Sequence, residues 1–196
     1  MTHVGNRYKI KNFHEISILN GFVSWLNTLS REDFQIVARP NPPDAIIKGV
    51  TQTEWLEHTD AYRSDEEAKE ELSLATPGGE PYKREKVLLV EPDKRIVAAI
   101  LNNVHRKLQK NSYKEAFEKY GPGTLIISER DALFDEQSLE LVRRSLPSYY
   151  FHGDRGYFKR AYLCIRSEGG YFFELLYEKT VTSSRLVDDD TAHITV

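Results

Sequence analysis

The feature that most constrains the fold is a short apolar run, TLIIS at 124–128, which follows a long helical pattern. A continuously apolar run of this length is typical of a central strand that is buried on both faces of a sheet. Apolar residues recur at helical spacing over 94–119, and Gly121-Pro122-Gly123 ends that pattern. The chain is therefore expected to contain a central sheet with helices packed against it.

Other periodic segments extend this pattern. Residues 13–29 have the apolar stripe of an amphipathic helix, and the strand pattern at 34–39 is ended by consecutive prolines. The later segments are strands at 44–49 and 51–57, a helix at 134–145, and strands at 159–166 and 171–179. This order of helices and strands predicts an α/β fold with a central mixed β-sheet flanked by helices.

The chain length predicts one domain. A length of 196 residues with 40% hydrophobic content suits a single domain, 1–196, with one sizeable core. We expect the core at about 10–130, an additional helix and strands at 131–180, and a polar tail at 181–196. The charged segment 59–93 contains Pro-Gly-Gly and predicts a weakly ordered excursion, with a short helix at 64–74, beside the functional face.

Composition indicates the cellular location and restricts the classes of partner. No apolar run reaches the length of a membrane span, the N-terminus lacks the apolar segment of a signal peptide, and Cys164 is the single cysteine. These features predict a cytoplasmic protein without a membrane partner. A net charge of −3 argues against non-specific coating of nucleic acid, although a local basic surface is compatible with it.

Two acidic residues on the expected hairpin are candidate metal ligands. If the hairpin loop is residues 48–50, Ile47 faces Thr51 and Asp44 faces Glu54, with Cβ atoms about 5 Å apart. Carboxylates at that distance repel each other unless a cation such as Mg²⁺ lies between them. The backbone carbonyl of Trp55 can supply a further oxygen. The alternative is that both acids lie on a solvated face of the hairpin.

Glu15 lies in the middle of the apolar stripe of the first predicted helix. A buried carboxylate needs a partner or a raised pKa, because burial disfavours its charged form. A cation held by the hairpin acids, or a water bound to it, would serve as that partner. The alternatives are a salt bridge to an arginine or lysine and partial exposure near the start of the helix.

Lys107 and Lys110 are the candidate cationic groups on the 94–119 helix. Lys107 is expected to point toward the sheet, where its charge can stabilise a developing negative charge on a phosphate. The alternative is that both are boundary lysines that extend to solvent. His14, His58 and His105 do not have the spacing of a metal-binding motif. Surface or capping roles are therefore expected for all three.

The run Pro43-Asp44 followed by Glu54-Trp55-Leu56, after a helix that carries Glu15, resembles the PD-(D/E)XK nuclease superfamily over residues 10–130. The resemblance implies a restriction-endonuclease-like αβββαβ core. It also implies Mg²⁺- or Mn²⁺-dependent hydrolysis of phosphodiester bonds, with DNA favoured over RNA as the substrate. Asp44 and Glu54 would be metal ligands and Glu15 the acid on the helix.

One position departs from the family pattern. The family's lysine belongs two residues after Glu54, where Leu56 stands. Either Lys107 or Lys110 has taken over that role in an active endonuclease, or the fold has lost its chemistry and serves as a nucleic-acid- or protein-binding module. A third hypothesis is a structural protein whose acids form ordinary surface pairs. The sequence does not determine the oligomeric state, and a dimer is compatible with it.

Overall fold

The computed structural model describes residues 3–62, 69–70, 73, 82, 91–129, 134–146, 155–167 and 169–179, with only the backbone described at 3–11. The predicted polar tail at 181–196 lies outside the described residues. Most of the predicted excursion at 59–93, including nearly all of the predicted helix at 64–74, lies outside them as well. Strand β3 continues to Ala61, so the beginning of that excursion belongs to the sheet.

The described residues form one six-stranded mixed sheet in the order β1-β2-β3-β4-β5-β6. The strands are β1 (Gln35–Ala38), β2 (Ala45–Lys48), β3 (Thr53–Ala61), β4 (Gly123–Glu129), β5 (Phe158–Ser167) and β6 (Gly170–Glu178). Strands β3, β4 and β5 are mutually parallel, whereas β2 and β6 run antiparallel to their neighbours. Every residue of β4 is buried, which confirms the prediction that TLIIS is a central strand.

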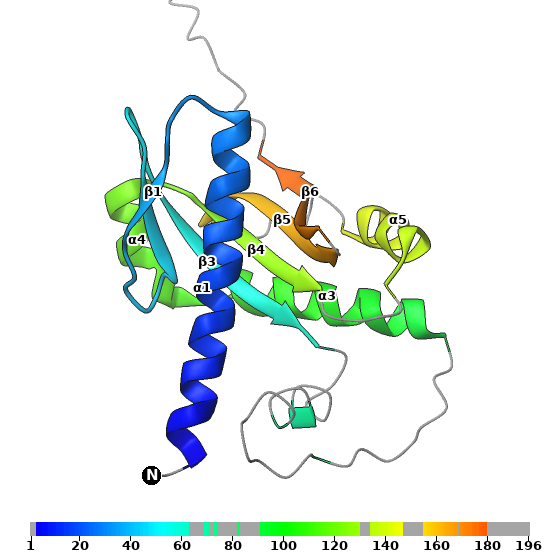
Figure 1. Ribbon diagram of the computed structural model, residues 1–196. Coiled ribbons are helices and arrows are strands. Elements are labelled where there is room, and N and C mark those ends of the chain that lie inside the picture. The colour runs from blue at the N-terminus through cyan, green and yellow to red at the C-terminus, as the bar shows by residue number, and fades with distance from the viewer. Residues whose placement is uncertain are drawn as a thin grey trace, which may run out of the picture.

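Helices cover both faces of the sheet (Figure 1). Helix α1 (His3–Leu29) crosses one face, where Leu19 and Phe22 pack on strand residues such as Leu56. The other face is covered by α3 (Pro92–Leu108), α4 (Lys114–Tyr120) and α5 (Glu136–Ser145). The predicted α/β fold with a mixed sheet flanked by helices is thus confirmed. Among the described residues, no helix is both long enough and apolar enough to cross a membrane.

The prediction of a single helix over 94–119 is wrong. Helix α3 ends at Leu108, and a 3₁₀ turn, η1 (Asn111–Tyr113), separates it from α4. The backbone at Lys110 is extended, with φ −73° and ψ 134°, which a continuing helix does not allow. The break turns Tyr113 into the core, where its ring stacks on that of Trp55 at a centroid distance of 5.5 Å.

Trp55 also holds the glycine-containing segment that ends this helical region. Its indole Nε1 donates a hydrogen bond of 2.8 Å to the carbonyl of Gly121. A Cβ on Gly123 would overlap the indole ring, so a residue without a side chain is required for this close approach. The chain between α4 and β4 is therefore held against β3, the strand that carries the candidate site.

The hairpin between β2 and β3 has a different register from the predicted one. Its turn spans residues 49–52, and Ile47 lies opposite Glu54. Glu32, from the connection before β1, holds this turn: its carboxylate accepts from the backbone N–H of Thr51 at 2.8 Å, and its carbonyl accepts from that of Val50 at 2.8 Å. The prediction that Asp44 lies opposite Glu54 is wrong, because the turn is one residue longer than expected and begins later.

Candidate functional site

Strand β3 presents alternate side chains to the two faces of the sheet. Trp55 packs in the core beneath α3, α4 and α5, whereas Leu56 packs in the core beneath α1. The alternation therefore places Glu57 on the α3 face, and His58 and Asp60 on the α1 face. We refer to Asp44, Glu57, Lys107, Lys110 and Tyr113 as the carboxylate site, and to His14, His58 and Asp60 as the histidine cluster.

Asp44 begins the carboxylate site at the edge where β2 starts. Ala45 pairs with Leu56, so continuing the register by one residue places Asp44 opposite Glu57. Its Oδ2 accepts a hydrogen bond of 2.7 Å from the backbone N–H of His58. The Asp44 carboxylate thus takes the position of a further acceptor in the β2–β3 ladder, which fixes it beside β3.

Glu57 is the most buried charged residue of the carboxylate site, with 4% of its surface exposed. Its Oε1 accepts from Lys107 Nζ at 2.5 Å and from Tyr113 Oη at 2.9 Å. Its Oε2 is buried and has no hydrogen-bond partner. Burial raises the pKa of Glu57, Lys107 opposes that rise, and the charge of Asp44 adds to it. A buried carboxylate oxygen without a partner is unfavourable unless a cation satisfies it.

Lys107 bridges two groups on β3. In addition to its bond to Glu57, its Nζ donates to the backbone carbonyl of His58 at 2.9 Å, so Lys107 points toward the sheet as predicted. Lys110 lies close enough for the same charges to act on it: its pKa is lowered, mainly by burial and then by Lys107, while Glu57 and Asp44 act in the opposite direction.

Tyr113 supports Glu57 as a hydrogen-bond donor. Burial, followed by the charge of Glu57, raises the pKa of the Tyr113 hydroxyl well above its ordinary value. The hydroxyl consequently keeps its proton and donates it to Glu57 Oε1. Because the break between α3 and α4 is what turns Tyr113 inward, that break contributes directly to the geometry of the carboxylate site.

Three residues of the predicted site lie elsewhere. Glu54 is on the opposite face of β3 from Glu57 and pairs with Lys159, with 2.9 Å between Oε1 and Nζ. Glu15 forms an ion pair with Arg39, the alternative that its position on the helix left open. The Trp55 backbone lies within the β2–β3 ladder, opposite Ile46. The structure therefore brings together Asp44, Lys107 and Lys110, but Glu54 does not join them.

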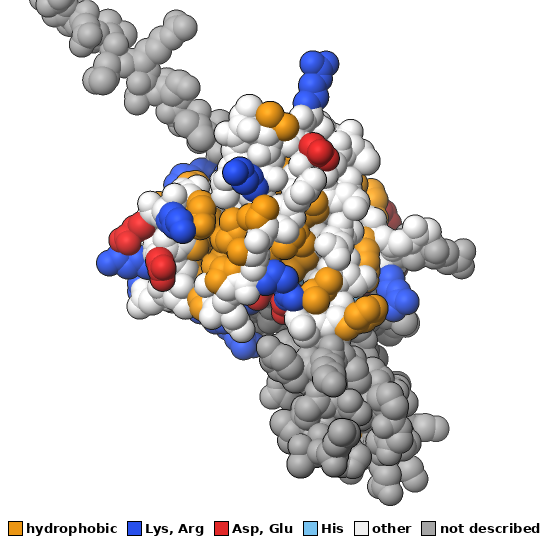
Figure 2. All heavy atoms as spheres, turned by 60° about the vertical axis from the view of Figure 1, so that its left-hand side comes forward, with side chains coloured by type: hydrophobic (Ala, Val, Ile, Leu, Met, Phe, Trp, Pro, Cys, Tyr) orange, Lys and Arg blue, Asp and Glu red, His pale blue; other side chains and the backbone are white. Residues whose placement is uncertain are grey.

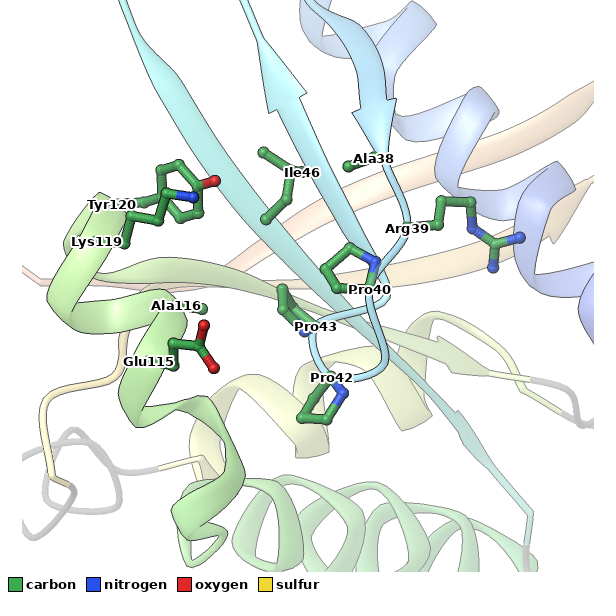
Figure 3. Close-up of a pocket in the computed structure, with 10 residues that line it drawn as sticks. All are labelled: Ala38, Arg39, Pro40, Pro42, Pro43, Ile46, Glu115, Ala116, Lys119 and Tyr120. Carbon is green, nitrogen blue, oxygen red and sulfur yellow. The ribbon is translucent and has the colours of Figure 1, made fainter.

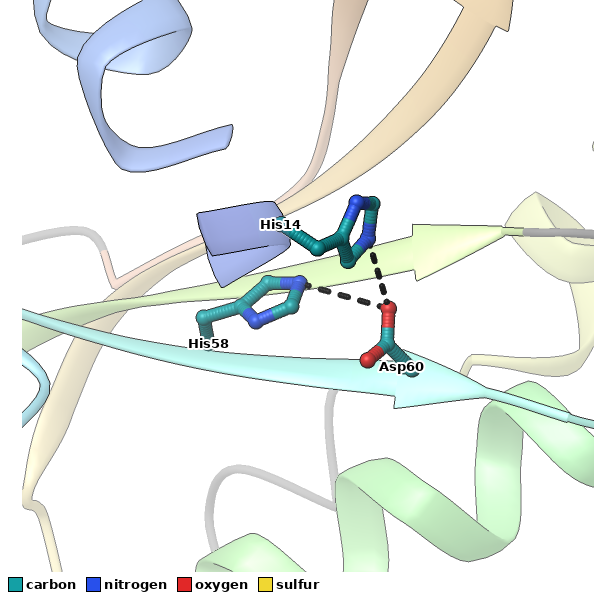
Figure 4. Close-up of side chains that lie close together, drawn as sticks. All are labelled: His14, His58 and Asp60. Atoms are coloured by element: carbon teal, nitrogen blue, oxygen red, sulfur yellow. Dashed lines mark hydrogen bonds and ion pairs between the residues drawn. The ribbon is translucent and has the colours of Figure 1, made fainter. Parts of the chain in front are cut away.

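The histidine cluster joins α1 to the other face of β3 (Figure 4). Asp60 Oδ1 lies 3.3 Å from His14 Nε2 and 3.7 Å from His58 Nε2. The prediction of surface or capping roles for these two histidines did not include this arrangement. The available signal was the spacing of His58 and Asp60, because residues two apart on a strand share one face. Nothing local in the sequence indicates that His14, which is 46 residues before Asp60, is the third member.

A pocket of about 450 Å³ adjoins the carboxylate site, between the β1–β2 connection and α4 (Figure 3). Pro42, Pro43 and Ile46 line it together with Tyr120 of α4, and the Arg39 side chain points away from it toward α1. The space-filling view of this side shows hydrophobic side chains gathered in a hollow with Lys and Arg nearby (Figure 2). Pro43 directly precedes Asp44, so the pocket is a concave surface next to the candidate site.

Comparisons of the chain with models of known families, with curated proteins and with solved structures give no match. The chemistry of the two clusters is accordingly what indicates function. The carboxylate site offers hard oxygen donors, which suit Mg²⁺ and Mn²⁺, and the partnerless Oε2 of Glu57 fits such an ion. The histidine cluster offers two imidazoles and one carboxylate, which suit transition-metal ions.

Proposed function

We propose that this chain is a divalent-metal-dependent nuclease of the PD-(D/E)XK type that hydrolyses phosphodiester bonds of DNA or RNA. The observation that carries the proposal is the buried, partnerless Oε2 of Glu57, on the strand next to Asp44 and beneath Lys107. Asp44 and Glu57 are the proposed metal ligands. Glu57 thereby replaces Glu54, which pairs with Lys159 on the opposite face of β3.

The order of the elements supports this proposal. Helix α1, strands β1 to β3, helix α3 and strand β4 come in the αβββαβ order that the resemblance implies, with η1 and α4 inserted between α3 and β4. Asp44 precedes β2 and Glu57 lies in the adjacent strand, as the paired acids of the motif require. Counted from Glu57, the family's lysine position is Thr59, and we propose that Lys107 from α3 supplies the missing ammonium group.

Each residue of the carboxylate site has a role in this proposal. A Mg²⁺ or Mn²⁺ ion held by Asp44 and Glu57 would polarise the phosphate and activate a water molecule. Tyr113 orients Glu57 through its hydroxyl, and the backbone N–H of His58 orients Asp44. Lys107 supplies positive charge where negative charge develops on the phosphate, a contribution that is typically worth about 3–4 kcal/mol.

The test is cleavage of single- and double-stranded DNA and RNA with Mg²⁺, with Mn²⁺ and with EDTA. We expect cleavage that requires the metal, and a loss of at least about a thousandfold in Asp44→Asn and in Glu57→Gln. Glu54→Gln is the matched control, because Glu54 is also a buried glutamate of β3, and it is expected to retain cleavage. Retained cleavage in Glu57→Gln together with its loss in Glu54→Gln would overturn the assignment.

One observation favours a second candidate function. The Lys107 ammonium already contacts Glu57 Oε1 and the His58 carbonyl, in the way that a bound cation would. A lysine that substitutes for the metal would leave a nuclease-like fold that binds nucleic acid without cleaving it. Salt-dependent binding of nucleic acid, combined with no cleavage and no Mn²⁺ binding by the unmodified protein, would support this binding module instead.

A further inference from the structure

We propose that His14, His58 and Asp60 form a second metal site, selective for Zn²⁺ or a similar transition-metal ion, on the α1 face of β3. This site differs from the carboxylate site in its position and in its donors. The two sites lie on opposite faces of one strand, and the histidine cluster adds imidazole nitrogens, which Mg²⁺ does not favour. Its existence does not depend on nuclease activity.

The distances in the cluster suit a metal ion of this kind. A tetrahedral Zn²⁺ with bonds of about 2.0–2.1 Å separates neighbouring ligand atoms by about 3.3 Å. Asp60 Oδ1 lies 3.3 Å from His14 Nε2 and 3.7 Å from His58 Nε2. One ligand atom from each residue falls within 4.8 Å of the other two. Small side-chain rotations are therefore enough to bring all three donors to bonding distance of one ion.

The charge of the cluster also favours a cation. Asp60 supplies a negative charge beside the buried His58. The Ser128 hydroxyl is hydrogen-bonded to His58 Nε2 at 2.8 Å. This hydrogen bond would break when the nitrogen binds the metal. Three protein ligands leave a fourth tetrahedral position for water or for another ligand.

A metal ion here would connect two parts of the fold. His14 lies on α1 and Asp60 on β3, so one ion would tie the helix to the sheet across 46 residues of sequence. His58 also serves the carboxylate site through its backbone, because its N–H bonds Asp44 and its carbonyl accepts from Lys107. Occupancy of the histidine cluster would therefore restrain the same residue that positions two groups of the carboxylate site.

The test is titration of the chelator-treated full-length chain with ZnCl₂ by calorimetry, with melting temperature as a second readout. We expect one bound Zn²⁺ per chain, a raised melting temperature, and no displacement by excess Mg²⁺. His14→Ala and Asp60→Asn should each weaken Zn²⁺ binding by at least about a hundredfold. The control is His105→Ala, at an exposed residue of α3, which should bind Zn²⁺ like the unmodified chain.

Two further measurements keep the outcome decisive. X-ray absorption of the Zn²⁺-bound, unmodified chain should show two imidazole nitrogens, which requires no variant to fold. Asp44→Asn should retain Zn²⁺ binding, which separates this proposal from the nuclease proposal. Absence of saturable Zn²⁺ binding, a spectrum without imidazole ligands, or undiminished affinity in correctly folded His14→Ala would overturn the second metal site.

Discussion

The two faces of β3 carry polar groups that are satisfied in different ways. On the α3 face, Glu57 is a buried acid held by a lysine and a tyrosine, with one oxygen left without a hydrogen-bond partner. On the α1 face, His58 is a buried base with a lowered pKa, hydrogen-bonded to Ser128 and close to Asp60. One strand can therefore present hard oxygen donors on one side and imidazole donors on the other.

The difference between these faces lies in the type of partner. Glu57 depends on a full positive charge from Lys107, whereas the hydrogen bond of the His58 ring is to the neutral Ser128 hydroxyl. Removing a charged partner from a buried acid is costly, because the remaining charge is left uncompensated. Removing a neutral partner from a buried, neutral histidine costs about as much as one hydrogen bond. The face that carries Glu57 should therefore respond more strongly to the loss of a partner.

The largest effect is expected for Lys107→Ala in metal-free protein. Glu57 would then be buried without its cation, and the free energy of unfolding should fall by roughly 3 kcal/mol at pH 7. That value is the cost of protonating a carboxyl group whose ordinary pKa is 4.5. Urea denaturation measures the change, and it should be smaller at pH 5. Lys114→Ala, at an exposed lysine paired with Glu118, is the control. Equal effects of the two substitutions would contradict the expectation that Glu57 depends on its charged partner.

A second effect concerns pH on the histidine face. Burial lowers the pKa of His58 from 6.5 to about 4, although Asp60 and Asp44 oppose the shift. Between those values the unfolded chain binds a proton that the folded chain does not. The contribution of His58 to the stability of metal-free protein should therefore be full above pH 6.5 and should be lost as the pH falls toward 4, by roughly 3 kcal/mol.

Denaturation over this pH range, compared between the unmodified chain and His58→Gln, measures the contribution of His58. Glu57, whose pKa is raised, contributes in the opposite direction in both proteins, so the comparison isolates the histidine. The variant should show a flatter decline toward acidic pH. Parallel curves for the two proteins would mean that burial of neutral His58 does not govern this dependence.

A smaller effect is expected for His14→Ala in the presence of a chelator. The side chain of His14 is 26% exposed, and its 3.3 Å contact with Asp60 is weak by its length. The loss of stability should be about 1 kcal/mol, the ordinary value of a single hydrogen bond. Addition of Zn²⁺ should widen the gap between the two proteins, since only the unmodified chain keeps the full ligand set. A loss as large as that of Lys107→Ala would refute the difference between the faces.

The smallest effect is expected for Glu15→Gln. The Glu15–Arg39 pair is partly exposed, so its loss should reduce stability by less than about 1 kcal/mol, with a change that shrinks as salt is added. Thermal denaturation at low and high ionic strength measures this. A fall in Mn²⁺ affinity in the same variant would instead support the role that the family resemblance implies for Glu15.

The sequence predicted those features that local periodicity determines. The apolar run at 124–128 identified the central strand, and the position of Lys107 on its helical wheel predicted that it points toward the sheet. The break after α3 was not predicted, because the apolar stripe continues through it. What favours the break is the packing of Tyr113 on Trp55, a contact between distant parts of the chain.

The candidate site was only partly predictable for the same reason. The predicted opposition of Asp44 and Glu54 was wrong, because the register depends on Glu32, which binds the turn from outside the hairpin. Because the turn is longer, Glu57 and not Glu54 lies opposite Asp44. Glu57 also lies on the other face of β3 from Glu54. His14 joins His58 only after α1 packs on the sheet, which no local pattern indicates.

The most direct test of the central claim is the affinity for Mn²⁺ measured by calorimetry on four proteins. These are the unmodified chain, Asp44→Asn, Glu57→Gln and Glu54→Gln. If Asp44 and Glu57 hold the metal, the unmodified chain and Glu54→Gln should bind Mn²⁺ alike, while the other two variants lose binding. Equal binding by all four proteins, or a loss confined to Glu54→Gln, would contradict the assignment of the carboxylate site.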